Sequence, residues 1–246
     1  MNISIQVSST LYLKDPTSSE IGLKILSEGI HLMQELGFES FTFKKLAQNI
    51  HSTEATIYRY FENKHNFLLY LINWYWGILS YRLMLATANV ADHRQQLTNS
   101  IAVLTGLPDP SQLGYIAEEM QLKRIVIQES GKALHTKMVD DENQNGIYLN
   151  YKHIVSTVSE LVKKIDPSFP YPEMLISNLI ENANQQRFFS VHLPRLTNTS
   201  SADDAVESFS HLIIQKLFTE INNTKISLQL NSKKCMLYLA EDEHHE

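Results

Sequence analysis

The sequence predicts an all-α protein, and three observations support this prediction. Of its 246 residues only 8 are Gly and 7 are Pro, about half the usual share of these turn-forming residues. No proline occurs between Thr17 and Leu107. Within that stretch apolar residues recur at intervals of three and four, as they do along the buried face of a helix.

Composition narrows the classes of protein to consider. Apolar residues make up 43% of the chain and charged residues 20%, which excludes a wholly disordered chain. The single cysteine, Cys235, excludes an intrachain disulfide and a cysteine zinc cluster. No apolar run approaches ~20 residues, so no membrane-spanning helix is expected, and the first ten residues lack the features of a secretory signal. We therefore expect a cytoplasmic protein.

The sequence of the N-terminal region predicts a short arm followed by a helix. Residues 1–17 show no helical period, and we expect a flexible arm there. Ser18 or Ser19 is a favourable N-cap for the first helix. Six apolar residues between Ile21 and Leu36 then fall on one face. Gly37 suits a helix end, because glycine adopts a left-handed conformation at little cost.

Two short helices and one long helix are expected next. Thr42 is the predicted N-cap of a helix that runs to about Ile50. The dipeptide His51-Ser52 breaks the pattern, and Thr53 is the predicted N-cap of a third helix over residues 54–60. A fourth, strongly apolar helix is expected over residues 64–87, capped by Asn63.

The remainder is expected to be helical as well, with proline-rich and polar interruptions. Residues 140–146 are expected to form a polar loop, and residues 223–246 form a tail that alternates like a strand over residues 226–230. The predicted helices cover residues 92–105, 111–129, 147–165, 172–190 and 202–222.

The short helices on either side of His51 have the layout of a helix-turn-helix. In that motif the N-terminal part of the second helix enters the major groove, so its outward side chains should be small or polar. Glu54, Ala55, Thr56 and Arg59 can face outward while Ile57 and Phe61 face inward. Hydroxyls and cations nearby are candidates for phosphate contacts, namely Thr42, Lys44, Lys45, Thr53, Tyr58, Tyr60 and Lys64.

Residues from about Ile21 to Leu69 resemble the DNA-binding domain of the tetracycline-repressor (TetR) family. The resemblance rests on Glu35-Leu-Gly-Phe38, Thr42, Leu46-Ala47, Leu68, and above all Thr56-Ile-Tyr-Arg-Tyr-Phe61 followed by Lys64. It implies a homodimer that binds double-stranded DNA at a near-palindromic operator and that a small-molecule effector releases. Repression is favoured over activation by analogy with the family alone.

Two features depart from the family pattern. His51-Ser52 stands where a Gly-Val pair is usual, so His51 must accept a positive φ or form a different turn. Residues 1–66 carry six Lys and Arg against seven Asp and Glu, a net charge of 6 − 7 = −1. Glu54 could accept a hydrogen bond from cytosine or repel a phosphate. These features keep open an alternative function, a protein-interaction adaptor without DNA binding.

The second domain, residues 67–222, is expected to bind the effector and to dimerise, whereas residues 18–66 bind DNA. The last two long helices pair with their copies by analogy with the family. The predicted interface consists of Leu175, Leu179, Ala183, Val206, Phe209, Ile213 and Leu217. Candidate residues for an effector pocket, which fit a filled core equally well, are Trp74, Tyr115, Met120, Met138, Tyr148, Tyr151 and Phe188.

Sequence patterns for metal binding or catalysis are weak. Glu207 and His211 lie four residues apart, as do His31 and Glu35, but exposed pairs of this kind are far more often solvated than metal-bound. No Gly-rich phosphate loop or catalytic motif occurs. We therefore expect no cofactor, no metal and no enzymatic activity, and a helical enzyme remains the less favoured alternative.

Overall fold

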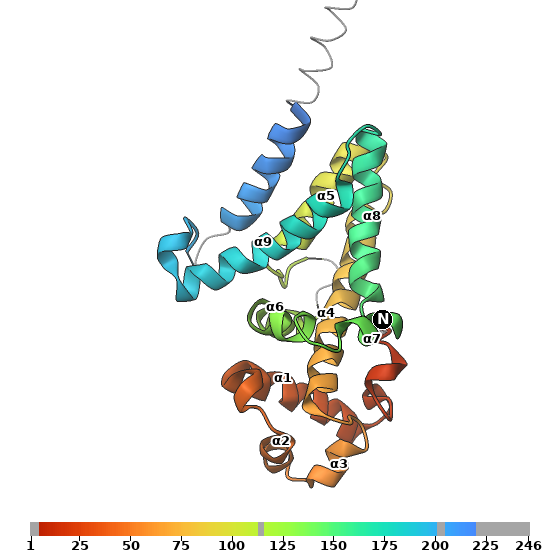
Figure 1. Ribbon diagram of the computed structural model, residues 1–246, viewed down its shortest axis with the longest axis vertical. Coiled ribbons are helices and arrows are strands. Elements are labelled where there is room, and N and C mark those ends of the chain that lie inside the picture. The colour runs from red at the N-terminus through yellow and green to blue at the C-terminus, as the bar shows by residue number, and fades with distance from the viewer. Residues whose placement is uncertain (1–4, 113–115, 201–204, 220–246) are drawn as a thin grey trace, which may run out of the picture.

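The computed structural model describes residues 5–112, 116–200 and 205–219, and the described part is helical without strands (Figure 1). The helices α1, α2 and α3 form the lower domain. The helices of the upper domain surround the long helix α4, which joins the two. The bounds are α1 (Glu20–Ser40), α2 (Phe43–Asn49), α3 (Glu54–Tyr58), α4 (Lys64–Thr87), α5 (His93–Thr105), α6 (Glu119–Leu134), α7 (Val139–Gln144), α8 (Leu149–Ile165) and α9 (Pro172–His192). A further helix covers residues 205–219.

Side-chain caps define where the helices of the lower domain begin. Ser19, Thr42, Thr53 and Asn63 each accept a hydrogen bond from a backbone N–H in the first turn of the helix that follows. Such caps satisfy N–H groups that have no partner within the helix. The predicted caps at Thr42, Thr53 and Asn63 are therefore confirmed, and of the two alternatives for α1, Ser18 and Ser19, the cap is Ser19.

The helix α4 is the axis of the molecule. Its observed bounds are those predicted from the sequence, and it contacts α5, α6 and α8. Its first half contributes Phe67 to the core of the lower domain, where this ring stacks on Phe41 at a centroid distance of 5.4 Å. Further along, Tyr75 and Leu79 are buried in the upper domain. A helix buried on nearly all sides joins the two domains rigidly.

The N-terminal arm is packed rather than flexible. Residues 9–11 and 16–18 form 3-10 turns, and Leu11 is 1% exposed. The backbone N–H of Leu13 donates to the carbonyl of Tyr60 at 2.8 Å, and Tyr12 packs edge-on against Tyr70. The expectation of a flexible arm was wrong for these residues, because Leu11 belongs to the hydrophobic core and Tyr12 packs against it. The arm lies beside α4 (Figure 1).

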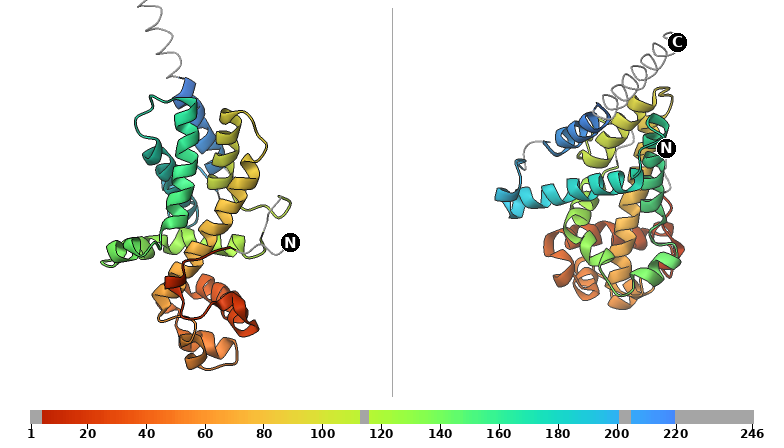
Figure 2. Two further views of the ribbon diagram at one scale, coloured as in Figure 1. Left: turned by 90° about the vertical axis from the view of Figure 1, so that its right-hand side faces the viewer. Right: turned by 45° about the horizontal axis from the view of Figure 1, so that its top comes forward.

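Two predicted elements of the upper domain also differ. The helix expected over residues 111–129 begins only at Glu119, and α7 occupies the region expected to be a polar loop. The polar segment is helical because Glu142 turns inward and is 5% exposed. Figure 2 shows α6 and α7 lying across the waist of the molecule, between the two domains.

Two further expectations concern the tail and the membrane. The segment 226–230, which alternates like a strand in the sequence, lies outside the described residues. None of the described helices is long and apolar enough to cross a membrane.

The turn between α2 and α3 uses a left-handed histidine. His51 has φ 54°, and the N–H of Ser52 donates to the carbonyl of Ala47 at 2.8 Å. This bond closes the end of α2 as glycine-containing ends do. Of the two alternatives that the sequence left open for His51, a positive φ or a different turn, the structure shows the positive φ.

Replacing His51 with glycine is expected to stabilise the protein. A left-handed conformation costs a residue with a Cβ about 1–2 kcal/mol, and glycine's greater chain entropy offsets part of that. The net gain should be about 0.5–1 kcal/mol, measured as a higher midpoint of thermal unfolding. Asn89, at φ 60°, is the matched control: Asn tolerates this region better, so Asn89→Gly should gain less. Equal shifts for both variants would show that His51 carries no particular strain.

Candidate nucleic-acid interface and effector pocket

The exposed face of α2 and α3 gathers most of the residues predicted to contact DNA. Thr42, Lys44 and Lys45 lie on the solvent side of α2. On α3 and its caps, Thr53, Glu54, Ala55, Tyr58 and Arg59 are exposed. Ile57 and Phe61 are fully buried beneath them. The predicted division of this helix into an outer polar face and an inner apolar face is therefore present, and the outer face is free of other described segments (Figure 1).

Tyr58 and Arg59 are the most prominent side chains of this face. The Tyr58 ring packs edge-on against Phe43 at 5.2 Å between centroids, yet 49% of the residue remains exposed. This contact holds one side of the ring while about half of the residue stays open to solvent. Arg59 follows directly at the C-cap of α3 and is exposed. A rigid phenol beside an exposed guanidinium suits contacts with phosphates and base edges.

Thr56 and Lys45 also hold the local structure. The Thr56 hydroxyl lies 3.0 Å from that of Ser52 and 3.1 Å from that of Thr53. It therefore links the turn to the first turn of α3, and it is half-buried. The ammonium of Lys45 donates to the carbonyl of Ser40 at 2.8 Å. Lys44 makes no such contact among the described residues, so it is the better placed of the two lysines for a phosphate.

The prediction of a DNA contact for Tyr60 is wrong for this conformation. Tyr60 is 1% exposed, and its hydroxyl shares a hydrogen bond of 2.8 Å with Ser19. That hydrogen bond lowers the pKa of Tyr60, and the ammonium of Lys14, 5.2 Å from the ring centroid, acts in the same direction. The ring lies inward because the N-terminal arm covers it. Tyr60 therefore ties the end of α3 to the start of α1.

Lys64 is half-buried, and backbone carbonyls already occupy its ammonium. Its ammonium donates to the carbonyls of Phe38 and Glu39 at 3.0 and 3.2 Å, and it lies 4.5 Å from the centroid of the Phe38 ring. Carbonyls at the end of a helix have no partner within the helix, and a lysine side chain can satisfy them. Its predicted phosphate contact is corrected to a structural one, in which Lys64 joins the first turn of α4 to the end of α1.

The lower domain matches a known family model. Residues 25–71 fit the model described as bacterial regulatory proteins, tetR family. This domain belongs to the TetR family. The match covers the whole helix-turn-helix and the first turns of α4, and it includes the turn in which His51 has a positive φ. No curated protein matches this sequence.

Solved structures show that the fold extends beyond the TetR domain. The TetR-family regulator PfmR from Thermus thermophilus superposes with a TM-score of 0.55 at 16% identity, over 78% of this chain and 97% of that one. A transcriptional regulator from Rhodococcus sp. Rha1 gives 0.58 at 13% identity, over 82% and 97%. The regulator AibR, solved with isovaleryl coenzyme A and operator DNA, gives 0.54 at 12% identity, over 76% and 95%. At these identities the likeness concerns the fold alone.

Two buried carboxylates connect the upper domain to the TetR domain. Glu129 on α6 is 4% exposed and accepts a hydrogen bond of 2.9 Å from the backbone N–H of Phe38, at the end of α1. It also pairs with Lys132 at 2.8 Å, which raises the pKa of that lysine. This contact anchors α6 directly on α1, beside the kink at Gly37, whose φ is 71°.

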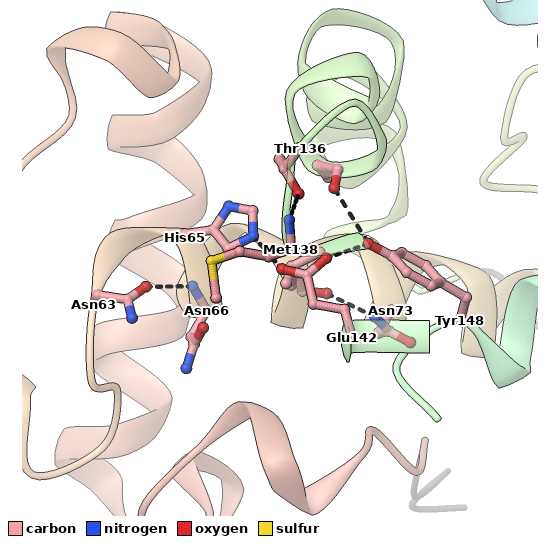
Figure 3. A network of polar contacts seen from close by, with 10 residues as sticks. Asn63, His65, Asn66, Asn73, Thr136, Met138, Glu142 and Tyr148 are labelled. Atoms are coloured by element: carbon pink, nitrogen blue, oxygen red, sulfur yellow. Dashed lines mark hydrogen bonds and ion pairs between the residues drawn. The ribbon is translucent and has the colours of Figure 1, made fainter. Parts of the chain in front are cut away.

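The second carboxylate is Glu142 on α7, at the centre of the network in Figure 3. One of its oxygens lies 2.7 Å from Nε2 of His65, in the first turn of α4, and the other accepts a hydrogen bond of 2.5 Å from the Tyr148 hydroxyl. The same hydroxyl lies 3.2 Å from the carbonyl of Ala133. Burial and the neighbouring carboxylate raise the pKa of Tyr148. The network joins α4, α6, α7 and α8 next to the TetR domain.

The predicted pocket residues do not line one cavity. Met120 and Phe188 line a cavity of about 370 Å³ between α6 and α9. Tyr148 and Tyr151 line a space of only about 10 Å³, and the Tyr151 ring packs at a tilt against Trp76 with centroids 4.5 Å apart, so this region is filled core. Met138 is 58% exposed, and Trp74 packs against Tyr70 instead. Tyr115 lies outside the described residues.

The predicted dimer residues divide into two groups. Leu179, Ala183 and Val206 are buried within the protomer, so the prediction that they form a dimer interface is wrong for them. Phe209, by contrast, is 51% exposed, and Leu175, Ile213 and Leu217 are half-buried. Sequence periodicity identified apolar positions on α9 and on the helix over residues 205–219, but it did not distinguish the positions that are buried within the protomer from those that are exposed.

One of the two His/Glu pairs considered as possible metal ligands is in contact. His211 and Glu207 approach to 3.6 Å, and burial lowers the pKa of His211. Within the described ranges no group of three or more His, Cys, Asp or Glu side chains lies close enough to hold a metal ion.

Proposed function

We propose that this chain is a ligand-responsive transcriptional regulator that binds a near-palindromic DNA operator as a homodimer. The observation that carries the proposal is the exposed face of α3, where Tyr58 and Arg59 stand outward over a fully buried Ile57. A helix presented in this way fits the major groove. The membership of this domain in the TetR family, and the DNA-bound structure of AibR, support the same interpretation.

A dimer is part of the proposal because one five-residue recognition helix contacts few base pairs. The apolar side chains exposed on the upper domain favour self-association. Val191, Leu196, Phe209 and Leu212 are between 47% and 64% exposed, and Leu196 and Phe209 line one surface hollow. A two-fold axis through this face would place the two copies of α3 on successive major grooves, about 34–36 Å apart.

The effector would act through the contacts at the waist of the molecule. A ligand can shift the protein between two states only if it binds one of them better. Because α6 both lines the cavity of about 370 Å³ and holds the N–H of Phe38 through Glu129, a ligand that displaces α6 moves the end of α1. This coupling favours release of the operator on ligand binding, and hence a repressor.

Selection of DNA from a pool of random duplexes by the full chain tests the proposal. We expect enrichment of a near-palindrome whose half-sites are about one helical turn apart. Binding should weaken as salt concentration rises, because each phosphate that a cation neutralises releases condensed counterions. The net charge of −1 over residues 1–66 favours the competing adaptor function. Failure to enrich any sequence at low salt would support the adaptor and exclude the regulator.

A further inference from the structure

The N-terminal arm, residues 5–19, contacts both domains. At its start Ile5 fills the space beside Gly77, in the second half of α4, because a Cβ added to Gly77 would lie 2.2 Å from Cγ2 of Ile5. The next residue, Gln6, accepts a hydrogen bond of 3.2 Å at its carbonyl from the side-chain amide of Asn150, in the first turn of α8. These contacts tie the beginning of the arm to the upper domain.

Further along, the same arm holds the end of the recognition helix. Leu11 is 1% exposed in the core, and the N–H of Leu13 donates to the carbonyl of Tyr60 at 2.8 Å. The ammonium of Lys14 lies 5.2 Å from the centroid of the Tyr60 ring. Tyr60 directly follows Arg59, which is exposed at the C-cap of α3. The arm therefore fixes the backbone next to an outward side chain of the recognition helix.

The attachment of the arm to the upper domain depends on how α8 lies on α4. The amide of Asn150 that holds Gln6 also donates to the carbonyl of Asn73 at 3.5 Å, so one side chain joins the arm, α4 and α8. A movement of α8 away from α4 would withdraw this amide from the arm. Ile5 is half-buried and Gln6 is exposed, and segments with few buried contacts open at a lower free energy than the core. The start of the arm thus has two states, docked and released.

We propose that the N-terminal arm is a strap that couples the position of α8 to the recognition helix α3. In the docked state it restrains Tyr60, and with it the direction of Arg59. When the start of the arm is released, the 3-10 turn over Ser9–Leu11 passes the loss of restraint to Leu13. The end of α3 then gains a freedom that DNA binding must remove again, which weakens binding. The strap is a second connection between the domains beside Glu129, and it rests on the proposed function in taking operator binding as the regulated activity.

Moving one methyl group across the contact tests the strap in the full chain. Gly77→Ala places a Cβ against Cγ2 of Ile5 and should release the start of the arm. Adding Ile5→Ala removes that methyl and leaves the two Cβ atoms 3.7 Å apart, an ordinary contact, so the double variant should dock the arm again. Gly131→Ala is the control, because it also replaces a glycine within a helix and its Cβ would meet only Nδ1 of His135, at 3.8 Å.

Hydrogen exchange read by mass spectrometry, without DNA, measures the coupling. In Gly77→Ala we expect residues 5–19 and residues 54–61 to exchange roughly threefold faster or more, because exchange follows the population of the open state. The double variant and Gly131→Ala should exchange like the parent. Asn150→Ala, which removes the amide that holds Gln6, is a second variant that releases the arm. Parent-like exchange of residues 54–61 in both release variants would overturn the proposal, even if the arm itself exchanges faster.

Thermal unfolding checks that the arm fills the space beside Gly77. Alanine is a better helix former than glycine, so Gly131→Ala should raise the unfolding midpoint by about 2–4 °C. Gly77→Ala should gain less than this in the parent, because the new Cβ meets Ile5, and should gain the full amount in the Ile5→Ala background. Equal gains in the two backgrounds would contradict the contact on which the strap depends.

Operator binding distinguishes failure of this inference from failure of the proposed function. Gly77→Ala should weaken binding of the selected operator roughly 3- to 10-fold, and the double variant should return to within about twofold of the parent. A chain that binds no DNA but shows the coupled exchange would lose the regulator and keep the connection between the arm and α3. Parent-like operator binding by both release variants would refute the strap and leave the regulator standing.

Discussion

Arg59→Ala is expected to weaken operator binding roughly 5- to 150-fold and to relax the preference for one base. An arginine on a base edge is worth about 1–3 kcal/mol of discrimination. Arg59 is exposed at the end of α3, beside the half-exposed ring of Tyr58 on the same face. Fluorescence anisotropy with the selected operator and with a scrambled duplex would measure both effects.

Tyr58→Ala should behave differently from Arg59→Ala. Its hydroxyl is placed for a phosphate, so affinity should fall about equally for operator and scrambled DNA. Arg94→Ala is the control for loss of an exposed arginine, because Arg94 lies on α5, far from the TetR domain. If both α3 variants bind the operator as Arg94→Ala does, α3 is not the recognition helix.

The same assay tests Tyr60 and Lys64, the two residues whose predicted DNA contacts the structure does not support. Tyr60→Phe removes only the hydroxyl that bonds Ser19, so DNA affinity should stay within about twofold of the parent. Lys64→Met should lower the unfolding midpoint, because the carbonyls at the end of α1 lose their donor. The dependence of its DNA affinity on salt should be unchanged, because that ammonium neutralises no phosphate. If the slope of log K against log salt concentration fell by about one in this variant, Lys64 would contact a phosphate after all.

Local signals allowed the sequence to predict most of the fold. The caps at Thr42, Thr53 and Asn63 are short-range features, and all three helices begin where those residues place them. The place of His51 in the turn reduced its conformation to two alternatives, of which the positive φ is observed. The helical nature of α7 could not be predicted in this way, because it depends on Glu142 meeting His65, 77 residues away in the chain.

The candidate site was only partly predictable for a similar reason. Spacing identified α3 and its outward face, but Tyr60 and Lys64 also fall at plausible positions for phosphate contacts. Their true environment depends on the N-terminal arm and the end of α1, which a periodic pattern does not reveal. In the upper domain, aromatic residues suggested a pocket, whereas the cavity is distinguished by Lys123, a residue type that sequence reasoning places on the surface.

Phe209→Glu is expected to convert the protein to monomers and to weaken operator binding about a hundredfold or more. A carboxylate at the centre of an apolar interface would be buried without a partner, and two half-sites are bound together only while the TetR domains are linked. Phe209 is the better choice than Leu179, which is 4% exposed and would report unfolding of the protomer instead.

Sedimentation velocity and anisotropy together measure this prediction, with Leu212→Glu as a second variant on the same face. Leu149→Glu is the matched control, because Leu149 is 64% exposed at the start of α8 and lies away from that face. We expect the control to remain dimeric and to bind the operator like the parent. The unfolding midpoints of the Phe209 and Leu212 variants in the monomeric state should be alike, since neither side chain belongs to the core of the protomer. Dimers that persist in both variants would place the interface elsewhere on the upper domain, and the spacing of the two recognition helices would then have to be derived from another face.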